Sequence, residues 1–188
     1  MLKKHFLTLL VGLTLVAIFS CSKDDDPGKL YIRFKLDGDQ QNFSGSENSI
    51  NTGFGPDVST SSGFFDFETN IDISLSMEQD SITEQDLKDL IGQKIKVPHC
   101  FGVGCGTSMD LNWDINGDYY SSSGDDNPFP QYYFQINKVE YLRTVEPFDV
   151  EYKQLIVEGV FELNISHSSD VKSLSDGEFR LIFEESFF

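Results

Sequence analysis

Three side chains able to bind a metal or to form a disulfide lie close together near the middle of the chain. They are His99, Cys100 and Cys105, in the glycine-rich segment HCFGVGCG. Outside the cytoplasm an even pair of cysteines indicates a disulfide, and the glycines allow a short loop to bring the two sulfurs together. A closed zinc site would need a second Cys or His cluster, which the sequence lacks. We therefore expect a Cys100–Cys105 disulfide, with a metal site that includes His99 as the alternative.

Oxygen ligands for calcium follow the cysteines along the chain. Asp110, Asp114, Asn116 and Asp118 are spaced two to four residues apart, and such carboxylate and amide oxygens suit Ca²⁺. Their order departs from an EF-hand loop because Gly117 directly follows Asn116. An Asn-Gly pair is also the strongest short signal for a two-residue hairpin turn. A hairpin without metal is the expected structure, and a calcium site is the alternative.

Aromatic side chains in the same region could bind sugars. They are Trp113, Tyr119, Tyr120, Tyr132 and Tyr133, in a segment rich in Asp, Asn and Ser. Aromatic rings stack on sugar rings while polar groups reach the hydroxyls, so this composition indicates a glycan-binding patch. Strand alternation would instead bury Trp113 and about half of the tyrosines in the core.

Hydrolytic catalysis has little support in the sequence. A Ser–His–acid site needs an exposed nucleophile within reach of a histidine, and after the leader only His99 and His167 remain. No G-x-S-x-G motif is present. Carboxylates are so abundant that no chosen pair indicates a glycoside hydrolase. We expect no enzyme and no cofactor, and a hydrolase with an unrecognised site is the alternative.

The N-terminus has the order of a lipoprotein leader. Lys3 and Lys4 precede an apolar run, 6–19, whose length suits a signal peptide better than a membrane span. The sequence IFSC that ends at Cys21 resembles a bacterial lipobox, in which the cysteine is lipidated before the leader is removed. Acyl chains anchor a protein with ~0.8 kcal/mol per buried CH₂. We expect a signal peptide over 1–20 and lipidation at Cys21, with an ordinary secretory signal as the alternative.

An acidic run follows the lipobox. Ser22, Lys23, Asp24, Asp25 and Asp26 resemble the export tag of Bacteroidota lipoproteins that are carried to the outer face of the outer membrane. A charged run that ends in Pro-Gly also forms a solvated tether. We expect a flexible acidic tether over 21–29, with the protein lipid-anchored at the outer membrane. The resemblance favours the cell exterior over the periplasmic side.

Charge and length limit the partners and the number of domains. The chain has 31 acidic and 14 basic residues, a net charge of −17. Such a charge repels phosphate backbones, so nucleic acid is excluded as a partner. Residues 30–188 have the length of one domain with a sizeable core.

Alternating apolar residues predict β-strands along most of this domain. Residues 30–36 alternate and lead into Asp37-Gly38, which predicts a hairpin with a partner strand over 40–46. Residues 44–63 read as a loop or irregular edge. Ser81 and Glu84 have capping-box spacing, which predicts a helix over 82–91. Asp80-Ser81-Ile82 also resembles a short bacterial O-glycosylation signal.

The C-terminal third is the most regular. Strands are predicted over 131–142 and 152–166, with Gly159 marking a bulge or a close approach, and a turn is predicted at Ser175-Asp176-Gly177. In total we expect about nine or ten strands and one helix. This pattern predicts an all-β fold, an antiparallel β-sandwich or partly open barrel.

Three segments carry a resemblance to a known family. They are the Leu36-Asp37-Gly38 hairpin, the strand VEGVFEL over 157–163 and the segment SDGEFR over 175–180. Together with the leader and the tether they resemble a family of small Bacteroidota lipoproteins with a β-sandwich domain; residues 48–130 have no counterpart in it. The resemblance implies a fold and supplies no catalytic residue.

The expected function is therefore that of a membrane-anchored, cell-surface lipoprotein with a non-catalytic binding or structural role. Its partners would be the outer-membrane lipid, reached through Cys21, and a glycan or a protein. The alternative is an accessory protein that captures glycans for a nutrient-uptake system.

Overall fold

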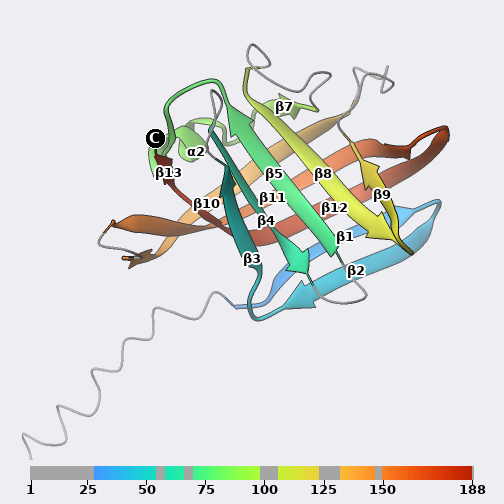
Figure 1. Cartoon of the computed structure of the whole chain (residues 1–188), viewed down its shortest axis with the longest axis horizontal. Helices are drawn as coiled ribbons and strands as arrows, with labels where there is room; N and C mark the ends of the chain where they lie inside the picture. Colours follow the sequence, from blue (N-terminus) through green and yellow to red (C-terminus); the bar gives the residue numbers. More distant parts are fainter. Residues whose placement is uncertain are drawn as a thin grey trace, which may run out of the picture.

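The computed structural model describes residues 28–53, 58–65, 70–97, 106–122, 132–146 and 150–187, and most of these residues are in β-strands (Figure 1). The all-β, sandwich-like fold expected from the sequence is confirmed, and the sheet does not close into a barrel. The elements are β1 Leu30–Leu36, β2 Asp39–Gly45, β3 Ser49–Gly53, β4 Val58–Phe65, β5 Asn70–Met77, β6 Ser81–Ile82, α2 Glu84–Asp89, β7 Lys94–Lys96, β8 Ser108–Ile115, β9 Asp118–Ser121, β10 Tyr133–Val145, β11 Tyr152–His167, β12 Asp170–Glu184 and β13 Ser186–Phe187.

One folded sheet supplies both layers. Its 11 strands include the path β2-β1-β12-β11-β10-β7-β8-β5-β4-β3, and β9 pairs with both β8 and β11. The sheet is mixed because β7 runs parallel to β8, while the long neighbours β10, β11 and β12 are antiparallel. In Figure 1 the layer of β3, β4, β5 and β8 crosses in front of the layer of β1 and β10–β12. The short β6 and β13 form a separate pair.

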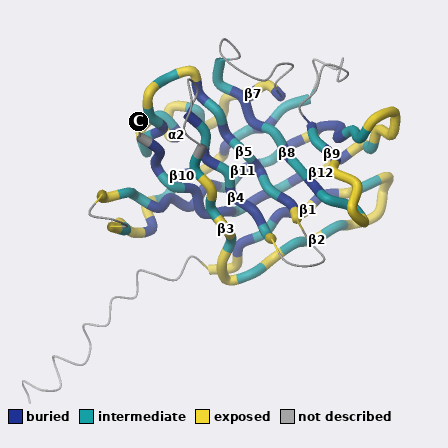
Figure 2. Tube along the Cα trace, viewed as in Figure 1, coloured by how far each residue is buried: buried dark blue, intermediate teal, exposed yellow. Residues whose placement is uncertain are grey.

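Aromatic rings join the two layers at the centre of the core. Phe34 of β1 meets Trp113 of β8 edge-on, with 5.3 Å between ring centroids, and its centroid lies 6.0 Å from that of Phe161 of β11. Phe43 of β2 approaches Trp113 at 5.4 Å. Figure 2 shows buried residues alternating with half-buried ones along β5 and β8, as period-two strands require. Trp113 is therefore a core residue.

Two Gly-x-Phe segments face each other on β11 and β12. In the antiparallel register Gly159 is opposite Phe179, and Phe161 is opposite Gly177. A Cβ atom on Gly159 would lie 2.5 Å from the ring of Phe179, and one on Gly177 would lie 2.4 Å from the ring of Phe161. Each ring thus covers the glycine of the opposite strand. The close approach expected at Gly159 is confirmed.

Asn48 fastens the corner before β3 to the backbone of β12. Pairing of β1 with β12 ends at Arg180. Farther along β12, the Asn48 side chain accepts from the Ile182 backbone N–H at 2.9 Å and donates to the Ile182 carbonyl at 3.1 Å. Ser62 of β4 donates to the same carbonyl at 2.6 Å. A side-chain amide therefore takes the place of a neighbouring strand here.

Replacing Asn48 with alanine is expected to lower the free energy of unfolding by about 2 kcal/mol, because the Ile182 N–H loses its acceptor in a partly buried setting. Urea denaturation measures the change. Asn51→Ala on the exposed surface of β3 is the matched control, since that side chain is exposed. Equal stability of the two variants would show that the hydrogen bonds of Asn48 to the Ile182 backbone do not stabilise the fold.

The predicted helix is confirmed as α2, with different ends. Its N-cap is Thr83, whose hydroxyl accepts from the Asp86 N–H while the Asp86 carboxylate accepts from the Thr83 N–H at 2.9 Å. The capping box expected from Ser81 and Glu84 is wrong, because Ser81 belongs to β6 and pairs with β13. Among the described residues, no helix has both the length and the apolar character needed to cross a membrane.

Two other expectations about local structure are wrong in part or in full. The segment 44–63, expected as a loop or irregular edge, does reach an edge of the sheet at β3, but its described residues are mostly strand. It contains β3 and most of β4, in which Val58, Thr60 and Ser62 alternate inward. Because the inward positions include a serine and a threonine, the strand alternation was not visible as an apolar pattern.

Ser175–Gly177, expected as a turn, lies inside β12, where Asp176 has φ 51° and the pairing with β1 shifts register. This segment makes a bulge, and the chain turns instead at Ser168, between β11 and β12. The described residues form 13 strands, more than the nine or ten expected.

Candidate functional site

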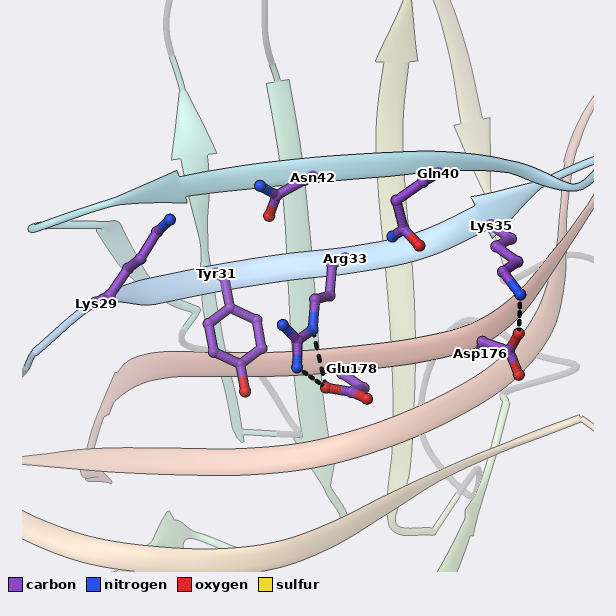
Figure 3. A pocket seen from close by; sticks show the side chains of 8 residues that line it. All are labelled: Lys29, Tyr31, Arg33, Lys35, Gln40, Asn42, Asp176 and Glu178. Atoms are coloured by element: carbon purple, nitrogen blue, oxygen red, sulfur yellow. Dashed lines mark hydrogen bonds and ion pairs between the residues drawn. The ribbon is translucent and has the colours of Figure 1, made fainter.

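A polar groove of about 590 Å³ opens on the outer face of β1, β2 and β12 (Figure 3). Strand alternation explains it. Leu30, Ile32 and Phe34 of β1 point into the core, so the residues that alternate with them, Tyr31, Arg33 and Lys35, point outward. The adjacent strands β2 and β12 add amides and carboxylates. The lining residues are Lys29, Tyr31, Arg33, Lys35, Gln40, Asn42, Asp176 and Glu178.

Ion pairs hold two of the cations in place. Arg33 donates through Nε to the Glu178 carboxylate at 2.9 Å and through Nη2 to the same oxygen. Lys35 Nζ lies 2.8 Å from the Asp176 carboxylate. These hydrogen bonds raise the pKa of Arg33 and of Lys35. The Arg33 guanidinium also lies 4.6 Å from the centroid of the Tyr31 ring, so it is fixed between a carboxylate and an aromatic ring.

Other polar groups in the groove make no hydrogen bond or ion pair within the described part of the chain. Lys29 makes no ion pair there, and neither the Tyr31 hydroxyl nor the Asn42 amide makes a hydrogen bond. The groove contains three cationic and two anionic side chains, in a chain whose net charge is −17. The groove is therefore a locally cationic region of an acidic protein, and it has hydrogen-bond donors available to a ligand.

A second polar cluster lies on the outer face of β5 and β8. The Asn112 amide donates to the carboxylate of Asp72 at 3.3 Å and to that of Asp110 at 3.0 Å, and the Ser74 hydroxyl donates to Asp72 at 3.0 Å. Burial, with a smaller contribution from the charge of Asp72, raises the pKa of Asp110 to about 6. Burial also raises the pKa of Asp72. The sequence offered no sign of this pairing.

The residues considered for calcium are divided between this cluster and a turn. Asp110 belongs to the cluster, whereas the Asp114 carboxylate accepts from the Gly117 backbone N–H at 2.8 Å. Asn116 and Gly117 have φ of 57° and 90°, as the expected hairpin turn requires. Asp118 is exposed on β9. Over the described ranges, no group of three His, Cys, Asp or Glu side chains is placed to hold a metal ion.

The five aromatic residues proposed for glycan binding do not form one surface. Trp113 is in the core, and Tyr120 is buried with its hydroxyl bonded to Asp170, a bond that raises its pKa. Tyr119 is 55 % exposed; partial burial of the side chain and the nearby carboxylates of Asp72 and Asp110 raise its pKa to about 12. Of the remaining pair, Tyr132 packs against the core, and the Tyr133 ring lies 3.8 Å from the ammonium of Lys94.

His167 is placed as a structural residue at the end of β11. Its Nδ1 lies 2.9 Å from the Tyr119 carbonyl, and its Nε2 is 4.0 Å from the exposed carboxylate of Asp118. These contacts join β9 to β11. Cys21, the run 22–26, His99, Cys100 and Cys105 lie outside the described residues, so lipidation, export and the disulfide stay predictions.

Sequence reasoning missed the groove, although part of its signal was present. The alternation of Tyr31, Arg33 and Lys35 placed three polar side chains on one face of a strand. What it did not show is that Asp176 and Glu178 would lie beside them, because that depends on the pairing of β1 with β12.

Comparison with known proteins adds no identification. No family model, no curated protein and no solved structure was found to match the chain. Function is therefore inferred from the residues and their geometry.

Proposed function

We propose that this chain is a bacterial lipoprotein, anchored through Cys21 at the outer membrane and facing the cell exterior, with a non-catalytic binding or structural role. The leader carries the proposal: two lysines, an apolar run and a lipobox-like end at Cys21. The acidic run 22–26 supports export to the surface. The same route takes Cys100 and Cys105 to an oxidising compartment, where we expect them to form a disulfide.

The fold is compatible with such an anchor. The tether leads directly into β1, which starts at Leu30. From Cys21 to Leu30 a chain reaches at most ~3.5 Å per residue, so the start of β1 would lie within roughly 30 Å of the lipid. Lys29 would then lie at the membrane-proximal end of the groove, which runs along β1 as far as Lys35.

Replacing Cys21 with alanine is expected to abolish lipid attachment, because the cysteine sulfur is the atom to which the acyl-bearing lipid group is attached. Incorporation of an alkyne-tagged fatty acid, followed by membrane fractionation, measures this, and protease treatment of intact cells reports which side the domain faces. Cys100→Ala is the matched control and should keep the label. Label retained by the Cys21 variant would refute lipidation at this residue; protection of the unaltered protein from protease would refute the exterior location.

Glycan capture is the second candidate function, and the groove favours it. A sugar requires donors and acceptors for its hydroxyls and an apolar surface for its ring, and the groove offers amides, carboxylates, cations and Tyr31. A glycan array probed with the full-length protein tests this candidate. The groove replaces the dispersed aromatic residues as the place where binding would occur.

A further inference from the structure

We propose that the groove on β1, β2 and β12 binds an acidic saccharide, whose carboxylate or sulfate group is received by Lys29 and Arg33. The proposal rests on glycan capture as the function and specifies the class of glycan. An acidic saccharide is specified because a neutral sugar would not require the excess of cationic side chains that the groove has.

Charge is the first reason. The chain carries 31 acidic and 14 basic residues, so most of its surface repels anions. Fields from distant charges are screened beyond about 8 Å at physiological salt, and the groups that line the groove therefore dominate there. Those groups are three cations and two anions, and Lys29 has no ion pair among the described residues. A negatively charged ligand would therefore be attracted to the groove and repelled by the acidic surface around it.

The setting of Arg33 is the second reason. Its two side-chain hydrogen bonds to the described residues both go to one oxygen of Glu178, which leaves other N–H groups of the guanidinium for a ligand. Glu178 on one side and the Tyr31 ring at 4.6 Å hold the guanidinium, so little side-chain freedom is lost on binding. A planar, fixed guanidinium suits the paired oxygens of a carboxylate or sulfate.

The surrounding polar groups are the reason for a saccharide rather than a simple anion. Asn42 of β2 lies opposite Arg33 in the strand register, and its amide makes no hydrogen bond to the described residues. The Gln40 amide donates to the carbonyls of Phe34 and Gln41, so its own oxygen stays available as an acceptor. Such groups match hydroxyls. The groove, about 590 Å³, also exceeds the space that a lone oxyanion fills.

Calorimetric titration of the detergent-solubilised full-length protein tests the proposal. The probes are a uronic-acid oligosaccharide, a sulfated one, the neutral oligosaccharide of the same length, and inorganic sulfate. We expect the acidic oligosaccharides to bind about tenfold or more tightly than the neutral one, since a charge-assisted hydrogen bond contributes at least that factor. Affinity for them should fall as salt is raised.

Lys29→Gln is the informative variant because Lys29 is exposed and lies before β1, so the fold does not depend on it. It should weaken binding of the acidic oligosaccharides about tenfold and leave the neutral one unchanged. Lys96→Gln, an exposed lysine on β7 outside the groove, removes the same charge and should change nothing. Thermal melts confirm that both variants fold.

Each contrary outcome is distinct. If the neutral oligosaccharide binds as well as the acidic ones and Lys29→Gln has no effect, the acidic preference is refuted while glycan capture stands. If inorganic sulfate binds as tightly as the oligosaccharides, the site recognises an anion alone and the saccharide assignment is refuted. If no saccharide binds, glycan capture fails as well, and anchoring at Cys21 is unaffected.

Discussion

Gly159→Ala is expected to destabilise the protein by about 3 kcal/mol or more, since overpacking of a tight core costs about 1–3 kcal/mol and this site has backbone on one side. The added Cβ would lie 2.5 Å from the Gln135 carbonyl oxygen of β10 and 2.5 Å from ring atoms of Phe179. Neither neighbour yields easily, because Gln135 is part of the β10–β11 ladder and Phe179 is buried. Urea denaturation measures the loss.

Gly177→Ala is expected to destabilise by a similar mechanism but to be repairable. The three atoms nearest to its added Cβ all belong to the ring of Phe161, the closest at 2.4 Å. Phe161→Leu replaces that ring with a smaller side chain, so adding it to Gly177→Ala should recover part of the stability that Gly177→Ala loses. The analogous Phe179→Leu should not rescue Gly159→Ala, because the Gln135 carbonyl still blocks the Cβ. Double-mutant cycles for the two pairs report this difference as a coupling energy.

Gly45→Ala serves as the control for both cycles. A Cβ there would approach no atom more closely than 3.1 Å, so a smaller loss is expected. If Gly159→Ala costs no more than Gly45→Ala, the sheet relaxes around the added carbon and the facing Gly-x-Phe pairs are not a packing constraint. If Phe179→Leu rescues Gly159→Ala fully, the backbone of β10 is not the obstacle.

The same two segments show how far the sequence could predict the fold. Period-two alternation predicted most strands, and an isolated glycine predicted a close approach at Gly159. The sequence did not show that Phe179 would be the neighbour, because that pairing depends on where β11 turns into β12. Ser175-Asp176-Gly177 has the composition of a turn, yet it forms a bulge, and the reversal occurs at Ser168. Local turn chemistry was outweighed by pairing along two long strands.

The candidate site was predictable to a smaller degree. Alternation gave the outward face of β1, but the ion pair of Arg33 and Glu178 joins residues 145 positions apart in the chain. The composition around Trp113 indicated a binding surface, whereas the alternation of apolar residues predicted that Trp113 would be buried. In the structure Trp113 packs edge-on against Phe34, so composition alone misjudged its role.

Asp110→Asn is expected to stabilise the protein at pH 7 by about 2 to 3 kcal/mol. Burial raises the pKa of Asp110 from 3.8 to about 6, a difference of about two units at 1.36 kcal/mol each. A carboxyl group whose pKa is higher in the folded state favours folding when protonated. Its contribution is therefore complete below about pH 4 and is lost as the pH rises through about 6. An uncharged asparagine avoids that loss and can still accept from Asn112.

The pH dependence separates this mechanism from a general relief of negative charge. The advantage of Asp110→Asn should shrink towards zero as the pH falls from 7 to about 3, where the Asp110 carboxyl is protonated in both the folded and the unfolded state. Asp39→Asn removes the same charge from an exposed position on β2 and is the matched control. Guanidinium or urea unfolding at several pH values measures both variants. The stability advantage of Asp110→Asn could instead be constant with pH, or equal to that of Asp39→Asn. Either result would mean that burial beside Asp72 does not raise the pKa of Asp110. The ionised cluster on β5 and β8 would then not destabilise the folded protein.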